Sequence, residues 1–109
     1  MNYPSRIEKL QAQLRDTDMS AIWITRAENC QYLIGFRGHA ELDVSLLLTM
    51  DLCLVIASRL YADALQAREL EIRLIKTDLI STMKEVLSQL EVEVLGVSHA
   101  AITAKTLHS

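Results

Sequence analysis

The sequence has few residues that interrupt regular structure. Only three glycines and one proline occur in 109 residues, so the connections between helices and strands should be short. No apolar run reaches the roughly 18 residues that a membrane-spanning helix needs. The N-terminal stretch MNYPSRIEKL lacks the apolar region of a signal peptide. We therefore expect a cytoplasmic protein that does not contact a membrane.

The chain also lacks an excess of basic charge and a cysteine motif. It carries 11 Lys and Arg against 14 Asp and Glu, a net charge of −3, which excludes the basic footprint of a nucleic-acid-binding protein. Cys30 and Cys53 are too far apart for a C-x-x-C pair, so a redox pair or a zinc knuckle is not expected. No G-x-S-x-G pattern occurs, which argues against a serine hydrolase.

The apolar residues predict a single α/β domain over residues 1–109. Half of the residues are hydrophobic, enough for one core and too few for two. The hairpin expected at 44–57 requires an antiparallel pair, and alternating helices and strands need a sheet covered on both faces. We therefore predict a three-layer α/β/α fold with a mixed sheet of about five strands. Helices are expected at 5–17, 26–35, 58–71, 77–90 and from 102, and strands at 19–25, 44–49, 52–57, 71–76 and 92–97.

Several residues predict where these helices begin and end. Ser5 and Glu8 have the spacing of a capping box at the start of the first helix. Gly35 should end the second helix, because glycine enters the left-handed conformation without a Cβ clash. Thr77 is the expected N-cap of the 77–90 helix.

The apolar positions predict which side chains are buried. Leu60, Ala64 and Leu65 should share the buried side of the 58–71 helix. The buried side of the 77–90 helix should consist of Leu79, Met83, Val86, Leu87 and Leu90. Trp23 lies within an apolar strand and is expected in the core.

His39, Glu41 and Asp43 stand between the Gly35–Gly38 turn and the strand at 44–49. In a strand, residues spaced by two point to the same side and could share a cation. The alternatives are a solvated polar loop, or a loop that meets a ligand or a neighbouring subunit. His99 and His108 fall in a polar tail and are expected to be solvated.

The order of the segments and their amino-acid motifs resemble those of one family. The helix RIEKLQAQL, the strand AIWIT, the phrase ENCQYLIGFRG, the apolar hairpin and the segment SRLYADAL are similar to the N-terminal domain of the creatinase/prolidase/Xaa-Pro aminopeptidase family over essentially all 109 residues. Two motifs carry the resemblance, an E-N-x-x-Y-L-x-G-F phrase and a D-x-R-Y segment that lacks its acid here and has Leu60 inserted. The matching residues are Asn29, Tyr32, Gly35, Phe36, Arg59 and Tyr61.

The resemblance implies a non-catalytic role for this chain. In that family the catalytic centre belongs to a C-terminal pita-bread domain, which is absent here and holds two divalent metal ions such as Mn, Co or Zn. The implied partners are that catalytic domain, a second copy of the protein in a homodimer, and a short proline-containing peptide as substrate. No catalytic residue and no metal ligand is then expected in this chain.

The resemblance also assigns a role to the loop after the G-F phrase. In relatives this loop often projects toward the active site of the dimer partner and helps to bind or gate the substrate. Arg37 would pair with a substrate carboxylate, and His39 or Glu41 would contact the substrate terminus or close the entrance. Two alternatives remain, the N-terminal domain of a creatinase-like amidinohydrolase and a stand-alone α/β binding or scaffold module.

Overall fold

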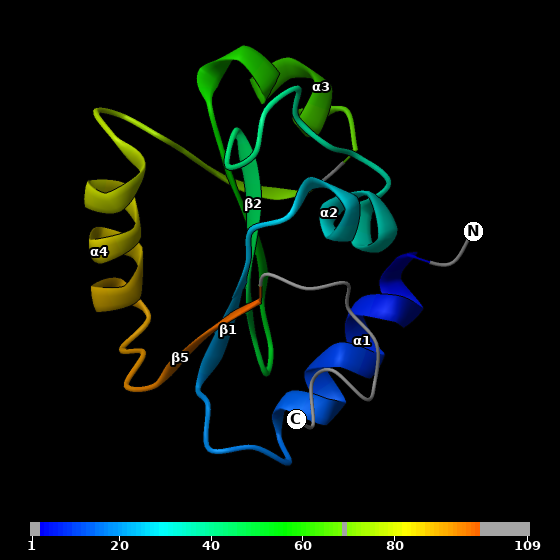
Figure 1. Ribbon diagram of the computed structural model, residues 1–109, viewed down its shortest axis with the longest axis vertical. Coiled ribbons are helices and arrows are strands. Elements are labelled where there is room, and N and C mark those ends of the chain that lie inside the picture. Colours follow the sequence, from blue (N-terminus) through cyan, green and yellow to red (C-terminus); the bar gives the residue numbers. More distant parts are fainter. Residues whose placement is uncertain (1–2, 69, 99–109) are drawn as a thin grey trace.

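In a computed structural model of the chain, which describes residues 3–68 and 70–98, helices cover both faces of a five-stranded sheet (Figure 1). The predicted three-layer α/β/α fold with a mixed sheet is confirmed. The helix expected from residue 102, His99 and His108 lie outside the described residues. The elements are α1 Tyr3–Leu14, β1 Ala21–Ile24, α2 Ala27–Ile34, β2 Val44–Thr49, β3 Cys53–Ala57, the 3-10 turn η1 Arg59–Tyr61, α3 Ala62–Gln66, β4 Glu71–Leu74, α4 Leu79–Gln89 and β5 Leu95–Ser98.

The strands lie in the order β4-β3-β2-β1-β5. The central strand β2 is antiparallel to both of its neighbours, β1 and β3, and the two outer strands run parallel to the strands they pair with. The predicted hairpin is β2 and β3, with Val44 opposite Ala57 and Leu48 opposite Cys53. Its turn is closed by the Thr49 hydroxyl, which accepts hydrogen bonds from the backbone N–H groups that follow it.

Side chains of the central strands alternate between two apolar layers. Since both faces of these strands are covered, their sequences read as continuous apolar runs rather than as a polar alternation. The layer beneath α4 contains Met83 and Val86, as the helical spacing predicts. Trp23 packs at its edge, partly buried, and its indole N–H donates to the Ser45 hydroxyl at 3.0 Å. On the face covered by α1, α2 and α3, the strands contribute Ile22, Ile24, Leu46, Leu48, Val55 and Ala57.

The first helix differs from the prediction at both ends. It already includes Tyr3, so Ser5 and Glu8 lie inside it and do not form a capping box at its start. The helix ends at Leu14 and not at residue 17. There the Thr17 hydroxyl donates to the Leu14 carbonyl at 2.7 Å, which satisfies a carbonyl left open at the helix end.

The start of α4 is also one residue later than predicted. Asp78, not Thr77, is the N-cap. Its carboxylate accepts the Ser81 backbone N–H at 2.8 Å and the Ser81 hydroxyl at 2.9 Å. These two hydrogen bonds lower the pKa of the Asp78 carboxyl, with the backbone bond as the larger cause.

The segment after β3 is shorter and tighter than the predicted helix. The Ser58 hydroxyl accepts the Leu60 N–H and starts a 3-10 turn, and α3 follows with only five residues. This turn changes the phase of the segment, so the prediction is wrong for Leu60 and Ala64, which are both exposed. Leu60 is 78% exposed, whereas Tyr61 and Leu65, four residues apart, are buried.

The end of α2 is as predicted. Gly35 adopts the left-handed conformation at φ 73°, and its N–H donates to the Gln31 carbonyl at 3.0 Å. A Cβ at this position would lie 2.7 Å from the Tyr3 ring, so α1 also depends on the missing side chain. Gly35 therefore ends the helix and leaves room for the neighbouring one.

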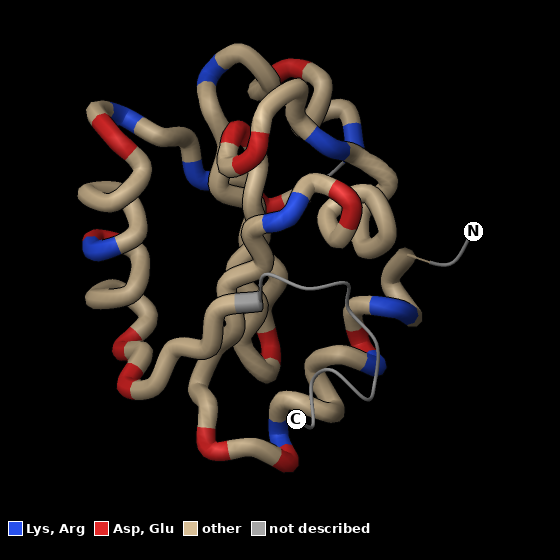
Figure 2. Tube along the Cα trace, in the orientation of Figure 1, with Lys and Arg blue, Asp and Glu red and all other residues tan. Residues whose placement is uncertain are grey.

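Charged residues are distributed over all layers. Figure 2 shows acidic and basic positions interspersed along helices and loops, with no stripe of one sign. Within residues 3–68 and 70–98, no helix has the length and apolar character to cross a membrane. The distribution agrees with the small net charge.

Candidate functional site

The loop between α2 and β2 carries Arg37, His39 and Glu41. It runs from Phe36 to Asp43 and lies beside η1, at the end of the sheet where β1 and β3 finish (Figure 1). Residues 39–43 form bends and a turn, and β2 begins only at Val44. The expectation that a strand places His39, Glu41 and Asp43 on one side is therefore wrong.

The side chain of Tyr61 anchors this loop. Its side chain is only 7% exposed, and its hydroxyl donates to the Asp43 carboxylate at 3.0 Å. The same hydroxyl accepts the backbone N–H of His39 at 2.9 Å. Its ring meets Phe36 edge-on at 5.9 Å and lies 6.1 Å from the His39 ring. Both ends of the loop thus contact one tyrosine.

Asp43 ties the second half of the loop to the hairpin. Its carboxylate also accepts the Ala40 N–H at 3.2 Å, and its backbone carbonyl accepts the Ser58 N–H at 3.0 Å. Between these anchors Leu42 has a φ of 70°, a left-handed conformation that a residue with a side chain rarely adopts. The loop is therefore a defined structure and not a loose connection.

Glu41 links the loop to the start of α2. Its carboxylate accepts the Ala27 backbone N–H at 3.3 Å, one of the amides that have no partner within the helix. A negative charge at this end of a helix is also favoured by the helix dipole. Next to it, Arg26 and Glu28 form an exposed ion pair at 2.8 Å. Glu41 therefore has a structural task that the sequence did not indicate.

Arg37 and His39 are exposed, so both can be reached from solvent. The His39 ring lies near the Tyr61 ring, whereas the Glu41 carboxylate accepts the Ala27 N–H at the start of α2. Across the described residues, no group of three or more His, Cys, Asp or Glu side chains is placed to hold a metal ion. The cation site considered from the spacing of His39, Glu41 and Asp43 thus has no support in the geometry.

The motif residues of the resemblance lie mainly in the scaffold around the loop. Asn29 is buried in α2, and Arg59 is exposed in η1. Tyr32 is half exposed on α2, where the Arg6 guanidinium lies 4.2 Å from its ring centre. Arg6 also donates to the Tyr32 carbonyl at 2.7 Å, which joins α1 to α2.

The two cysteines do not belong to a reactive site. Burial, followed by the nearby charge of Glu41, raises the pKa of Cys30 from 9.0 to about 12. Burial, followed by the charge of Glu71, raises the pKa of Cys53 to about 11. Since the thiolate is the reactive form, both thiols are suited to packing rather than to nucleophilic chemistry.

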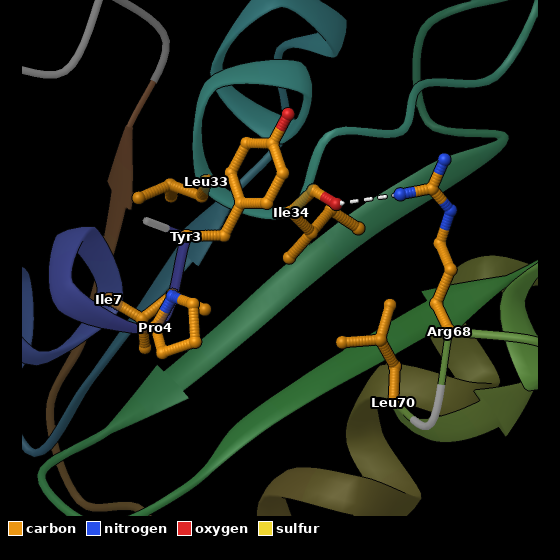
Figure 3. Close-up of a pocket in the computed structure, with 7 residues that line it drawn as sticks. All are labelled: Tyr3, Pro4, Ile7, Leu33, Ile34, Arg68 and Leu70. Atoms are coloured by element: carbon orange, nitrogen blue, oxygen red, sulfur yellow. Dashed lines mark hydrogen bonds between the residues drawn. The ribbon is translucent and has the colours of Figure 1, made fainter. Parts of the chain in front are cut away.

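A pocket of about 330 Å³ lies between the start of α1, the end of α2 and the chain before β4 (Figure 3). Its lining is mainly apolar. Arg68 stands at its edge, donates to the Ile34 carbonyl at 3.3 Å and lies 5.5 Å from the Phe36 ring centre. Sequence patterns did not indicate this pocket, because its walls come from three distant segments. It is lined by Tyr3, Pro4, Ile7, Leu33, Ile34, Arg68 and Leu70.

Known proteins with a similar sequence pattern or a similar structure share this fold. The sequence model of the creatinase/prolidase N-terminal domain matches residues 6–109. A search of curated proteins found no match. An Xaa-Pro dipeptidase from Bacillus anthracis has a similar structure, with a TM-score of 0.80 and 19% identity over 98% of this chain. The chain spans 30% of the length of that protein.

Two further solved structures are similar over four fifths or more of their length. The Xaa-Pro aminopeptidase from Streptococcus thermophilus has a TM-score of 0.75 and 18% identity, over 97% of this chain and 81% of that one. The N-terminal domain of the cytoplasmic peptidase PepQ from Mycobacterium tuberculosis has a TM-score of 0.60 and 21% identity, over 94% and 98%. At these identities the likeness concerns the fold.

Proposed function

Because the chain belongs to the creatinase/prolidase N-terminal domain family, we propose that it serves as the non-catalytic N-terminal domain of a longer, metal-dependent Xaa-Pro peptidase. The observation that carries this proposal is the family match over residues 6–109. The fold shared with the dipeptidase of Bacillus anthracis supports it. That enzyme is more than three times as long as the region of similarity, which leaves room for a separate catalytic domain.

The metal chemistry is assigned to that second domain. Two divalent ions, Mn, Co or Zn, would activate water there for cleavage of the bond before proline. The described residues of this chain have no matching set of ligands. The contribution of this domain is therefore structural: it forms part of a homodimer and shapes the entrance that a short proline-containing peptide uses. The PepQ domain comes from a cytoplasmic peptidase, and we propose the same compartment here.

Within this role, the loop Phe36–Asp43 faces the substrate. Arg37 is its exposed cation, and a guanidinium can form two parallel hydrogen bonds with a carboxylate. His39, two residues further along the loop, is also exposed. Glu41 supports the loop through its bond to the start of α2, and this leaves Arg37 and His39 as the substrate-facing pair.

Kinetics of the longer polypeptide test this function. We expect Arg37→Ala to raise KM for an Xaa-Pro dipeptide about tenfold or more, since a hydrogen bond to a charged group contributes about 1.5–3 kcal/mol. The kcat should change little. Lys84→Ala removes the same charge from the exposed face of α4 and is the matched control. Unchanged KM in Arg37→Ala would remove the loop from substrate binding.

A creatinase-like amidinohydrolase is the second candidate, since the matching family includes creatinase as well as prolidase. The two are separated by assaying the same longer polypeptide with an Xaa-Pro dipeptide and with creatine. Turnover of creatine alone would replace the peptidase proposal. Activity on neither substrate would favour a binding or scaffold module.

A further inference from the structure

Tyr61 carries a hydroxyl group that its packing does not require. The ring is buried against Phe36, and a phenylalanine ring would fill the same space. The hydroxyl is used twice: it donates to the Asp43 carboxylate and accepts the His39 backbone N–H. A buried tyrosine hydroxyl normally has such partners. Here both partners belong to one loop, although they are 18 and 22 residues away in the chain.

The loop shows a second sign of being held in place. Leu42 is in the left-handed conformation, and its apolar side chain is 39% exposed. The residues around it are fixed by two hydrogen bonds: the Ala40 N–H donates to the Asp43 carboxylate, and the Ser58 N–H donates to the Asp43 carbonyl. A strained residue persists where the surrounding contacts determine the backbone. The anchors therefore hold the loop in a conformation that the free chain would rarely adopt.

We propose that Tyr61 and Asp43 form a clasp that positions the loop, and that they act as positioning residues for Arg37 and His39. Only the statement that the loop faces a substrate rests on the proposed function. The clasp itself is a property of this chain. It joins the loop to the rigid β2–β3 hairpin through η1, so Arg37 is presented from a fixed platform and less ordering is needed when a ligand binds.

Amide hydrogen exchange on the 109-residue chain tests the clasp. Tyr61→Phe keeps the ring and removes the hydroxyl. We expect the His39 amide to exchange about five- to tenfold faster, as for the loss of one hydrogen bond from a locally opening segment. Amides of Leu46 and Leu47 in β2 should be accelerated no more than the His39 amide. Tyr32→Phe makes the same chemical change on the exposed side of α2 and should leave the His39 amide unaffected.

A second variant guards against an indirect effect of the tyrosine. Asp43→Ala removes the acceptor of both the Tyr61 hydroxyl and the Ala40 N–H, and it should accelerate exchange at His39 and Ala40 together. An unchanged His39 amide in Tyr61→Phe would overturn the clasp. Greater acceleration at Leu46 and Leu47 than at His39 would overturn it too, because the hydroxyl would then stabilise the sheet more than the loop.

Kinetics of the longer polypeptide separate the clasp from the proposed function. If the clasp positions Arg37, Tyr61→Phe should raise KM for the dipeptide severalfold and leave kcat nearly unchanged. The double variant with Arg37→Ala should then be no worse than Arg37→Ala alone. If Arg37→Ala raises KM and Tyr61→Phe does not, the positioning role is wrong and the proposed function stands. If neither changes KM, the loop's part in that function is wrong.

Discussion

Replacing Gly35 by alanine tests how the end of α2 is built. Gly35 has a φ of 73°, and a residue with a Cβ loses about 1–2 kcal/mol in the left-handed region. The new Cβ would also lie 2.7 Å from the Tyr3 ring, which is at the far end of a flexible side chain and can move aside. We therefore expect Gly35→Ala to lower the free energy of unfolding by about 1–2 kcal/mol. In a domain close to this size, each kcal/mol lowers the thermal midpoint by about 4–8 °C.

Urea unfolding followed by fluorescence measures this loss directly, since Trp23 is the single tryptophan and packs against the sheet layer beneath α4. Gly35→Asn is the matched control: it adds a Cβ at the same place, but asparagine tolerates the left-handed conformation better. Asparagine should therefore lose less stability than alanine. Equal losses would mean that the contact with Tyr3 decides the effect. An alanine variant as stable as the parent would refute both arguments.

Two further predictions concern ionisable groups. Since the pKa of Cys30 is raised to about 12 and that of Cys53 to about 11, the folded state holds these protons more tightly than the unfolded state. The stability they contribute is complete below pH 9.0, the ordinary pKa, and is lost at higher pH. Urea unfolding between pH 8 and 10.5 should thus show a shallower loss in Cys30→Ala, and an unchanged slope would contradict this. For Asp78, whose pKa lies below the ordinary 3.8, the carboxylate stabilises α4 above that pH and stops doing so as pH falls through the lowered value. Asp78→Asn should therefore have a lower thermal midpoint than the parent at pH 7, with a gap that closes in acid. A gap that persists at low pH would show that charge is not the cause.

Much of the fold follows from local patterns in the sequence. The runs at 44–49 and 52–57 predicted the hairpin because its two strands are adjacent in the chain. The spacing of Leu79, Met83 and Val86 predicted the buried side of α4 correctly, because an eleven-residue helix keeps one phase throughout. Leu60 was misplaced since a single 3-10 turn precedes α3 and rotates the residues that follow. Helix phase was thus predictable only where the helix was uniform.

The contacts of the candidate loop were not visible in the local pattern. The sequence pointed to the loop, but it did not reveal that Glu41 bonds the start of α2 or that Tyr61 bonds Asp43. These partners come from elements that only the folded sheet brings together. The hairpin register offered one usable signal: with Val44 opposite Ala57, Asp43 must lie beside Ser58 and close to Tyr61.

The pairing of β1 with β5 sets an order for synthesis and folding. Ser20 and Val94, at the start of this pairing, are bonded across 74 residues of chain, whereas β2 and β3 are neighbours. Until the ribosome has released β5, one side of β1 exposes open backbone groups within an apolar strand, a hazard for aggregation. Slow translation or early termination before Leu95 would leave a nascent chain that is prone to aggregate. The yield of intact protein should therefore depend on the capacity of the cell's chaperones.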